Sequence, residues 1–239
     1  MDMAYIRLDK FLSDLGIAGR KELKQIIRSG RVTVDGKSVC VPETKVDCEH
    51  SAVAMDGRVL VYAKFHYYMM DKPCGVLTAT EDGRQKTVLD LVTPEMRRMG
   101  IFPVGRLDKD TSGLLLLTDD GEFAHRVISP KSSVEKLYYA KVDGIPNEED
   151  AAAFEKGIVL SDGTQCLPAV LKISGDNSCY VTVMEGKYHQ VRRMLASRGK
   201  TVLELRRLSI GALALDDTLS PGEFRELEQC EIDSLFRSN

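Results

Sequence analysis

The part of the sequence best suited to chemistry is a polar loop around Asp108. Residues 105–113 read Gly-Arg-Leu-Asp-Lys-Asp-Thr-Ser-Gly and are followed directly by four leucines, residues 114–117. The leucines indicate a buried strand, and a carboxylate held in a loop beside a rigid strand is well placed for catalysis. The same residues could form an ordinary turn in which Asp, Ser and Thr bond their own backbone. The loop alone leaves both interpretations open.

Asp108 and Asp110 also invite comparison with magnesium-dependent phosphatases, which carry a D-x-D-x-T pattern. In those enzymes the aspartates follow an apolar strand, whose end presents both carboxylates to Mg²⁺ and phosphate. Here Thr111 follows Asp110 directly, and the apolar strand comes after the aspartates. The spacing and the order of elements therefore both argue against a metal-dependent phosphatase.

The composition describes a protein with a substantial core and no global positive charge. The chain has 239 residues, is 43% hydrophobic and carries a net charge of -3, so any RNA surface must be a local basic patch. Its six cysteines include no C-x-x-C pair, which favours reduced thiols over a disulfide frame or a zinc site. The sequence shows neither an apolar run of about 20 residues nor the layout of a signal peptide. We therefore expect a cytoplasmic protein that binds no membrane.

Residues 1–60 are expected to form a small domain made of two helices and a hairpin. Apolar residues between Leu8 and Leu15 recur with helical spacing, and Leu23 to Ile27 give a second helix its apolar side. Asp35-Gly36 lies between two short runs of strand-forming residues and predicts a tight hairpin turn. Residues 42–64 are less regular and are expected to complete this domain and link it to the rest.

The second helix of this domain carries positive charge on its solvent side. Between Arg7 and Lys37 there are eight basic and four acidic residues, a net charge of +4 in a chain that is negative overall. Such a patch can neutralise RNA phosphates, although most charge runs are simply solvated helix faces. The residues that we expect to contact RNA are Arg7, Lys10, Arg20, Lys21, Lys24, Arg28 and Arg31.

Residues 61–239 are expected to form a larger α+β domain with a mixed or mostly antiparallel sheet, because strands and helices do not alternate strictly. The expected strands are Tyr67–Met70, Leu114–Thr118, Leu137–Val142, Val170–Ile173, Tyr180–Met184 and Val202–Leu205. The expected helices are Val88–Arg97, Glu122–Ile128, Glu148–Phe154, Tyr188–Ser197 and Glu228–Phe236.

Two stretches resemble known protein families. Residues 7–36 resemble the S4 RNA-binding module of ribosomal and RNA-modifying proteins, and residues 105–114 resemble the G-R-L-D-x-x-T-S/T-G-L loop of pseudouridine synthases. The likeness to the RsuA type of these synthases extends along nearly the whole chain. The further matching segments are 71–75 (Asp-Lys-Pro-Cys-Gly), 118–121 (Thr-Asp-Asp-Gly), 128–130 (Ile-Ser-Pro), 135–138 (Glu-Lys-Leu-Tyr) and 185–194 (Glu-Gly-Lys-Tyr-His-Gln-Val-Arg-Arg-Met).

The resemblance implies an enzyme that converts uridine to pseudouridine without a cofactor or a metal ion, with Asp108 as its nucleophile. It implies that Tyr138 stacks on the target base, whereas by pattern alone this tyrosine would be an ordinary strand residue. Tyr139 would point to the opposite face of the strand, so only one of the two can line the pocket. Arg192 is implied to be the fixed cation that keeps the buried carboxylate ionised.

Two further arginines are candidate RNA contacts. Arg106 stands two residues before the nucleophile, and the resemblance implies that it approaches the flipped nucleotide or fills the space that the nucleotide leaves. An ion pair between Arg106 and a loop carboxylate such as Asp110 explains its position equally well. Arg193 is expected on the RNA-facing surface. His189 has either a packing or a hydrogen-bonding role.

The C-terminal segments 205–211 and 219–227, together with Tyr188-His189-Gln190, resemble the branch of the family that modifies 16S ribosomal RNA. The expected partner is therefore 16S RNA or a partly assembled small ribosomal subunit, and the expected state is a monomer. Two alternatives stay open. One is the same reaction on 23S RNA, and the other is a non-catalytic S4-domain factor that binds RNA or assists ribosome assembly.

Overall fold

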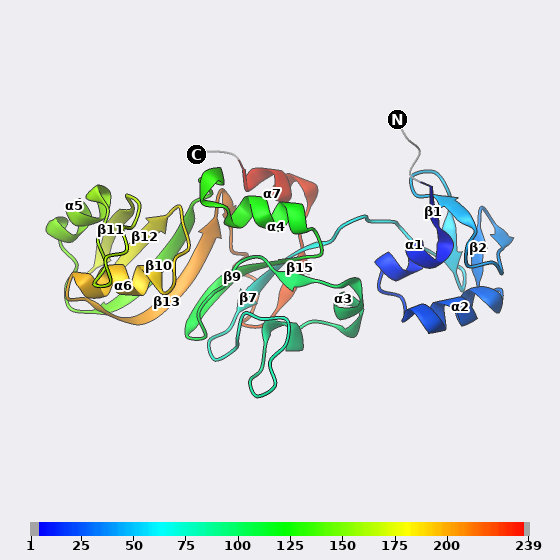
Figure 1. The fold of residues 1–239 in the computed structure, drawn as a ribbon, viewed down its shortest axis with the longest axis horizontal. Coiled ribbons are helices and arrows are strands. Elements are labelled where there is room, and N and C mark those ends of the chain that lie inside the picture. The colour runs from blue at the N-terminus through cyan, green and yellow to red at the C-terminus, as the bar shows by residue number, and fades with distance from the viewer. Residues whose placement is uncertain (1–4, 237–239) are drawn as a thin grey trace. The chain divides into compact units, whose positions relative to one another are not determined.

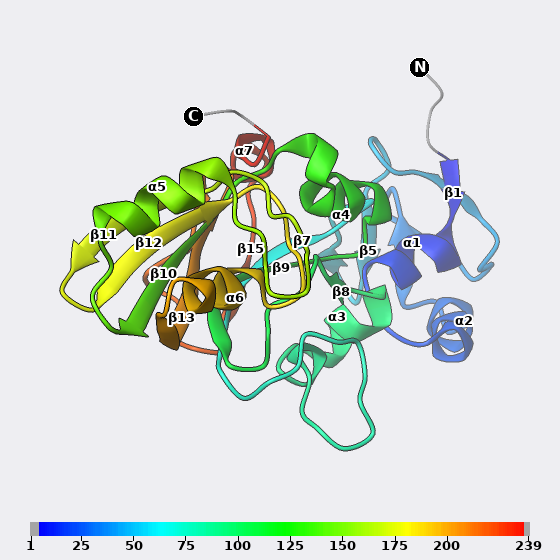
Figure 2. The same ribbon diagram turned by 60° about the vertical axis from the view of Figure 1, so that its left-hand side comes forward.

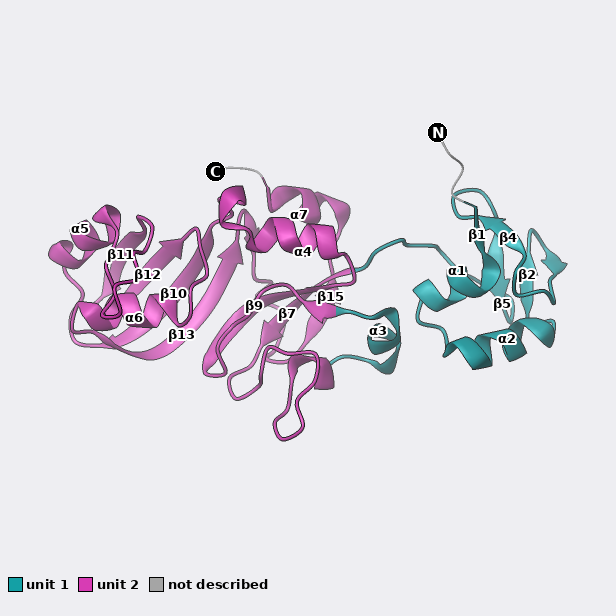
Figure 3. Cartoon of the chain, in the orientation of Figure 1, with its two compact units in different colours: residues 1–66, 92–101 teal, residues 67–91, 102–239 magenta. Residues whose placement is uncertain are grey.

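The computed structural model describes residues 5–236 of the chain (Figure 1). Contacts within the chain separate two units (Figure 3). Unit 1 contains the described residues up to His66 together with Val92–Ile101, and unit 2 contains Tyr67–Leu91 and the described residues from Phe102 onward. The expected boundary at residues 60 and 61 lies earlier than this division, because Tyr62 still packs within unit 1. Its ring centroid is 5.0 Å from that of Phe11.

Unit 1 has the expected helix–helix–hairpin start. Its elements are β1 (Tyr5–Arg7), α1 (Leu8–Asp14), α2 (Arg20–Arg28), β2 (Val32–Val34), β3 (Lys37–Ser38), β4 (Lys45–Asp47), β5 (Val53–Met55), β6 (Arg58–Val59) and α3 (Pro94–Met99). Strands β2 and β3 form the predicted hairpin, and both Asp35 and Gly36 have the positive φ that its tight turn requires. The stretch expected to be irregular contains β4, β5 and β6, and β5 joins β2 in a sheet of order β3-β2-β5-β6.

The predicted apolar faces of the two N-terminal helices are confirmed. Leu8, Phe11 and Leu12 of α1 are buried against Leu23 and Ile27 of α2 in one core.

The helix expected at Val88–Arg97 is two separate helices. A 3-10 turn, η1 (Val88–Asp90), ends before α3 begins at Pro94 with Thr93 as its N-cap. Proline has no backbone N–H and restricts the residue before it, so it suits the first turn of a helix and not its interior. The prediction was wrong because it ran through Pro94.

Unit 2 is built on a nine-stranded mixed sheet, as the α+β prediction stated. Its strands are β7 (Tyr67–Lys72), β8 (Phe102–Pro103), β9 (Thr111–Thr118), β10 (Lys136–Asp143), β11 (Val170–Gly175), β12 (Ser178–Val183), β13 (Thr201–Ile210), β14 (Leu213–Ala214) and β15 (Phe224–Glu226). The main order is β11-β12-β10-β13-β9-β7-β15. Strands β9 and β13 pair in parallel, whereas the other pairs of this sheet are antiparallel.

Helices cover the two ends of this sheet and create two apolar cores. They are α4 (Gly121–Ile128), η2 (Pro130–Ser132), α5 (Glu148–Lys156), α6 (Gln190–Ser197) and α7 (Gln229–Ser234). Figures 1 and 2 show α5 and α6 beside β10–β13, and α4 and α7 beside β7, β9 and β15. Strand β13 contributes Leu205 to the first core and Ile210 to the second. Strand β13 is therefore long enough to pack against both cores.

Helix ends in unit 2 follow local chemistry. Asp120 is the N-cap of α4, and its carboxylate accepts hydrogen bonds from the backbone N–H groups of Glu122 (2.9 Å) and Phe123 (3.0 Å). Helix α6 begins at Gln190, later than the predicted Tyr188, because His189 has a left-handed backbone with φ 48°. In the described part of the chain, no helix has both the length and the apolar character that crossing a membrane requires.

Candidate active site

Asp108 lies in the loop between β8 and β9, and a buried lysine holds this loop through its backbone. The Nζ of Lys72, at the end of β7, donates to the carbonyl oxygens of Pro73 (3.0 Å), Asp108 (3.1 Å) and Thr111 (2.9 Å). Burial lowers the pKa of Lys72 to about 8, although nearby acidic groups favour its charged form. Because Lys72 binds the carbonyl groups, the Asp108 carboxylate is not needed to hold the loop.

Neighbouring segments fix the rest of the loop. The backbone N–H of Gly75 donates to the carbonyl of Lys109 (2.7 Å), and the hydroxyl of Thr78 donates to the carbonyl of Leu107 (2.7 Å). At the start of β9, Gly113 has φ 101°, and a Cβ there would lie 2.2 Å from the carbonyl oxygen of Arg207. The close parallel pairing of β9 with β13 therefore requires glycine at this position.

Asp108 lines a pocket of about 460 Å³ within unit 2. This volume is in the range of pockets that bind small ligands. Side chains from several elements share the pocket with Asp108, among them those of Arg106, Lys136, Tyr138, Tyr188, His189 and Arg207. The structure therefore brings the predicted residues Arg106, Asp108 and Tyr138 to one cavity.

Tyr138 occupies the pocket side of β10, the side that the resemblance implied for it. Its hydroxyl accepts a hydrogen bond from Nη1 of Arg207 at 3.4 Å, and the guanidinium carbon lies 6.0 Å from the ring centroid. Tyr139 lies on the other face of the sheet, where its ring meets that of Tyr180 edge-on at 5.8 Å. The two neighbouring tyrosines therefore have different environments, and Tyr138 is the one that lines the pocket.

The predicted pairing of Arg192 with Asp108 is corrected by the structure. Nη2 of Arg192 lies 3.1 Å from the carboxylate of Asp110 and also 3.1 Å from its backbone carbonyl. The group beside Asp108 is His189, whose Nε2 lies 3.5 Å from Oδ1 of Asp108. The left-handed backbone of His189 delays the start of α6 and places the imidazole in this position. Arg106 is exposed at the pocket, and it is Arg192 that forms the ion pair with Asp110.

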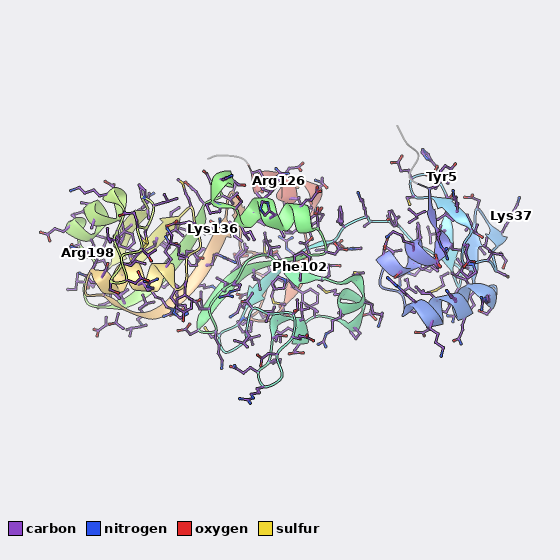
Figure 4. The ribbon with its side chains drawn as sticks, viewed as in Figure 1. Tyr5, Lys37, Phe102, Arg126, Lys136 and Arg198 are labelled. Carbon is purple, nitrogen blue, oxygen red and sulfur yellow. The ribbon has the colours of Figure 1, made fainter. Side chains whose placement is uncertain are left out.

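Two buried cations of the pocket were not predicted from the sequence. Nζ of Lys136 donates to the carbonyl groups of Val127 (3.2 Å) and Val134 (2.6 Å), and Nε of Arg207 donates to that of Leu114 (2.8 Å). Figure 4 labels Lys136 among the side chains of unit 2. Burial, together with the charge of Arg207, lowers the pKa of Lys136 to about 8. Strand alternation gave a partial signal, since Lys136 alternates with the buried Ala140 and Arg207 with the buried Leu205.

The segment before α6 forms another wall and is tied by buried polar groups. The Glu185 carboxylate accepts from the backbone N–H of Leu167 (2.9 Å) and from Nε2 of Gln190 (2.8 Å), and it pairs with Lys187 (2.6 Å). The Gln190 side chain in turn accepts from the backbone N–H of Lys187 at 2.9 Å. Arg193, expected to face RNA, forms an ion pair with Asp162.

The seven basic residues of unit 1 that were predicted to contact RNA fall into two groups. Those paired with carboxylates are Arg7 with Asp9 and Glu43, Lys10 with Asp14, and Arg31 with Asp56. The other four, Arg20, Lys21, Lys24 and Arg28, are exposed along α2. A groove of about 330 Å³ lies between α1 and α2, with Lys10, Arg20 and Lys24 among its lining residues. The charge available to RNA phosphates is therefore concentrated on α2.

Residues 5–236 contain no cluster of three or more His, Cys, Asp or Glu side chains arranged to hold a metal ion.

Comparisons with known proteins extend over both units. The RNA pseudouridylate synthase family matches residues 66–197, and the S4 domain family matches residues 6–53. An uncharacterized RNA pseudouridine synthase of Bacillus subtilis, YtzG, is 46% identical, with 95% of this chain and 97% of the relative covered. The ribosomal small subunit pseudouridine synthase A of Vibrio cholerae is 42% identical, with 97% and 100% covered. A crystal structure of a pseudouridylate synthase has a TM-score of 0.68 at 34% identity, with 96% and 99% covered.

Proposed function

We propose that this chain, which belongs to the RNA pseudouridylate synthase family, isomerises a specific uridine of 16S ribosomal RNA with Asp108 as its nucleophile. The observation that carries the proposal is the shared pocket of Asp108 and Tyr138. The two side chains come from different elements, and the pocket has room for a small ligand. The resemblance of the Asp108 loop to the family's catalytic loop supports the same assignment.

The reaction sets what the pocket must supply. The bond between ribose C1′ and uracil N1 breaks, the base rotates, and a bond forms between C1′ and C5. The proton of C5 is lost and N1 gains a proton, so substrate and product have the same atoms. The enzyme therefore needs a nucleophile, a place for the detached base and a proton acceptor near C5. Asp108 supplies the first, and Tyr138 lies where it can stack on the base and help to move the proton.

The charges around the pocket fit these roles. Lys136 and Arg207 place positive charge at a cavity where Asp108 must react as a carboxylate. Extruding a uridine from stacked RNA costs a few kcal/mol, which contacts to the flipped nucleotide must offset. Arg106, exposed at the pocket, is available either to contact this nucleotide or to fill the space it leaves.

The choice of 16S RNA is supported by the names of relatives that match nearly this whole chain. Those of Vibrio cholerae and Escherichia coli are called ribosomal small subunit pseudouridine synthase A. The S4 domain and its basic helix α2 supply a surface for structured RNA. We further propose a cytoplasmic monomer that acts on 16S RNA or on partly assembled small subunits, without a cofactor or a metal ion.

The decisive experiment uses unmodified 16S and 23S transcripts, each incubated with the purified protein and EDTA. Pseudouridine is then mapped by carbodiimide treatment and reverse-transcription stops. We expect one new stop in 16S RNA with the wild-type protein and none with Asp108→Asn. The variant should bind 16S RNA nearly as well as the wild type, because the substitution preserves shape and removes only the reactive charge.

Other outcomes distinguish the parts of the proposal. A stop in 23S RNA alone would keep the chemistry and overturn the assignment of the substrate. A stop that persists with Asp108→Asn would remove Asp108 as the nucleophile. The absence of any stop, in both transcripts and in partly assembled subunits, would favour a non-catalytic RNA-binding factor.

A further inference from the structure

Tyr188 and His189 form a stack of two rings at the pocket. Their centroids are 3.9 Å apart and their planes differ by 17°. Both residues line the pocket of Asp108, yet 67% of Tyr188 is exposed. An aromatic ring gains free energy by burial, so one that stays exposed beside a pocket presents an unused apolar face.

The backbone that carries this stack is strained and well anchored. His189 has φ 48° and ψ 34°, a left-handed conformation that residues with a Cβ adopt at a cost in free energy. Side-chain hydrogen bonds among Glu185, Lys187 and Gln190 hold the same segment, and Arg193 donates from Nη1 to the carbonyl of Tyr188 at 3.4 Å. The segment therefore keeps the two rings in place although Tyr188 contributes little to the core.

The position of the stack relates it to the reacting group. His189 lies 3.5 Å from the Asp108 carboxylate, and Tyr188 covers the imidazole. An RNA strand that places one uridine in the pocket must pass the rim on both sides of that nucleotide. The neighbouring bases lose their partner in the stack when the uridine leaves it, and an exposed aromatic ring can replace that partner.

We propose that Tyr188, backed by His189, stacks on a nucleobase adjacent to the target uridine. The ligand is the flat face of a base in single-stranded RNA, so the contact adds affinity and tolerates different bases. This proposal rests on the proposed function, because it takes Asp108 to mark the position of the target uridine. It adds a second binding position to the pocket, outside the one that receives the reacting base.

The first test compares Tyr188→Ala with the matched variant Tyr188→Phe. Dissociation constants for the 16S transcript are measured by filter binding, and circular dichroism checks that both variants are folded. We expect Ala to weaken binding about tenfold, which is within the usual range for losing one base–aromatic stack, and Phe to bind like the wild type. Equal binding by Ala and wild type, or equal weakening by Phe and Ala, would overturn the stacking role.

The second test locates the base. RNA fragments are made with an abasic nucleotide on the 5′ or the 3′ side of the mapped uridine. At the stacked side, the abasic fragment should weaken wild-type binding about as much as Tyr188→Ala does, and it should weaken the Ala variant no further. If the abasic nucleotide weakens binding by Tyr188→Ala by the same factor as binding by the wild type, on the 5′ side and also on the 3′ side, Tyr188 does not contact an adjacent base.

The two proposals can fail separately. If no uridine is modified but Ala still binds 16S RNA more weakly than Phe, the proposed function falls while stacking on RNA bases is supported. If 16S RNA is modified but Ala, Phe and wild type bind alike, the proposed function stands and this inference falls.

Discussion

Arg207 links three parts of the pocket through one guanidinium group. Its Nε binds the Leu114 carbonyl on β9, and its Nη1 binds the Tyr138 hydroxyl on β10, while its own strand is β13. The residue is buried, so its charge acts with little screening from water. Arg207 therefore has the geometry of a positioning residue that orients Tyr138.

A double-mutant cycle tests this role. Tyr138→Phe and Arg207→Met should each slow pseudouridine formation at saturating RNA by roughly ten- to a hundredfold, because both remove the same hydrogen bond. The double variant should be little slower than either single one. Tyr139→Phe, on the opposite face, is the matched control and should leave the rate unchanged. Losses that multiply in the double variant would show that the two residues act independently.

Lys136 predicts a pH dependence of stability. Its pKa is about 8 in the folded protein and about 10.4 when unfolded, so between these values the unfolded state binds more protons. Stability from this group therefore rises with pH across that window, by at most about 3 kcal/mol. The free energy of unfolding is measured by urea denaturation, followed by circular dichroism, for wild type and Lys136→Met from pH 7 to 10.5. We expect the value for wild type to rise with pH relative to that for the variant. Lys72 shifts in the same direction but is present in both proteins, so its effect cancels. Parallel curves would contradict the prediction.

At the scale of elements, the parallel pairing of β9 with β13 brings the Asp108 loop beside the strand that carries Arg207. Gly113 makes this approach possible, since its φ is 101° and a side chain there would meet the backbone of Arg207. The pocket therefore depends on a residue that has no side chain to line it.

Gly113→Ala should destabilise unit 2 by more than about 3 kcal/mol, because both the backbone conformation and the space exclude a Cβ. The matched control is Gly83→Ala, which lies in an exposed loop with open space and should change stability by less than about 0.5 kcal/mol. Urea unfolding of unit 2 measures both. Similar stabilities for the two variants would refute the requirement for glycine at residue 113.

Much of this organisation was predictable from the sequence, because it depends on local patterns. The hairpin turn at Asp35-Gly36, the cap at Asp120 and the strand at residues 114–117 all follow from neighbouring residues. The position of His189 beside Asp108 was not predictable, because it goes with a left-handed backbone that residues other than glycine rarely adopt. Alternation indicates that Lys136 and Arg207 face inward, but the carbonyl group that Arg207 binds lies on a strand distant in sequence, which a local pattern cannot specify.

At the scale of the whole molecule, the exposed basic helix α2 and the pocket belong to different units. Unit 1 carries the exposed basic residues of α2, whereas unit 2 carries the pocket. The predicted basic surface is smaller than expected, since Arg7, Lys10 and Arg31 are engaged by carboxylates. Affinity for RNA and reactivity should therefore be separable by substitution.

Reversing the charges of Lys24 and Arg28 to Glu should weaken binding to 16S RNA and lower the slope of log affinity against log salt by roughly two, one for each lost phosphate contact. The reversal of Lys45 and Arg58, which are exposed on β4 and β6, changes the net charge equally and serves as the control. Filter binding across a salt series measures both pairs. An equal loss for the control would assign the effect to net charge and not to α2.

The order of strands in the sheet also determines when the enzyme becomes complete during its own synthesis. Most of unit 1 lies within the first 66 residues, so its contacts are available early to a chain growing from its N-terminus. Arg207 lies late in the chain, and β15, which pairs with β7, ends only at Glu226. A growing chain therefore has its basic helix long before it has a finished pocket, and it can hold RNA before it can modify it.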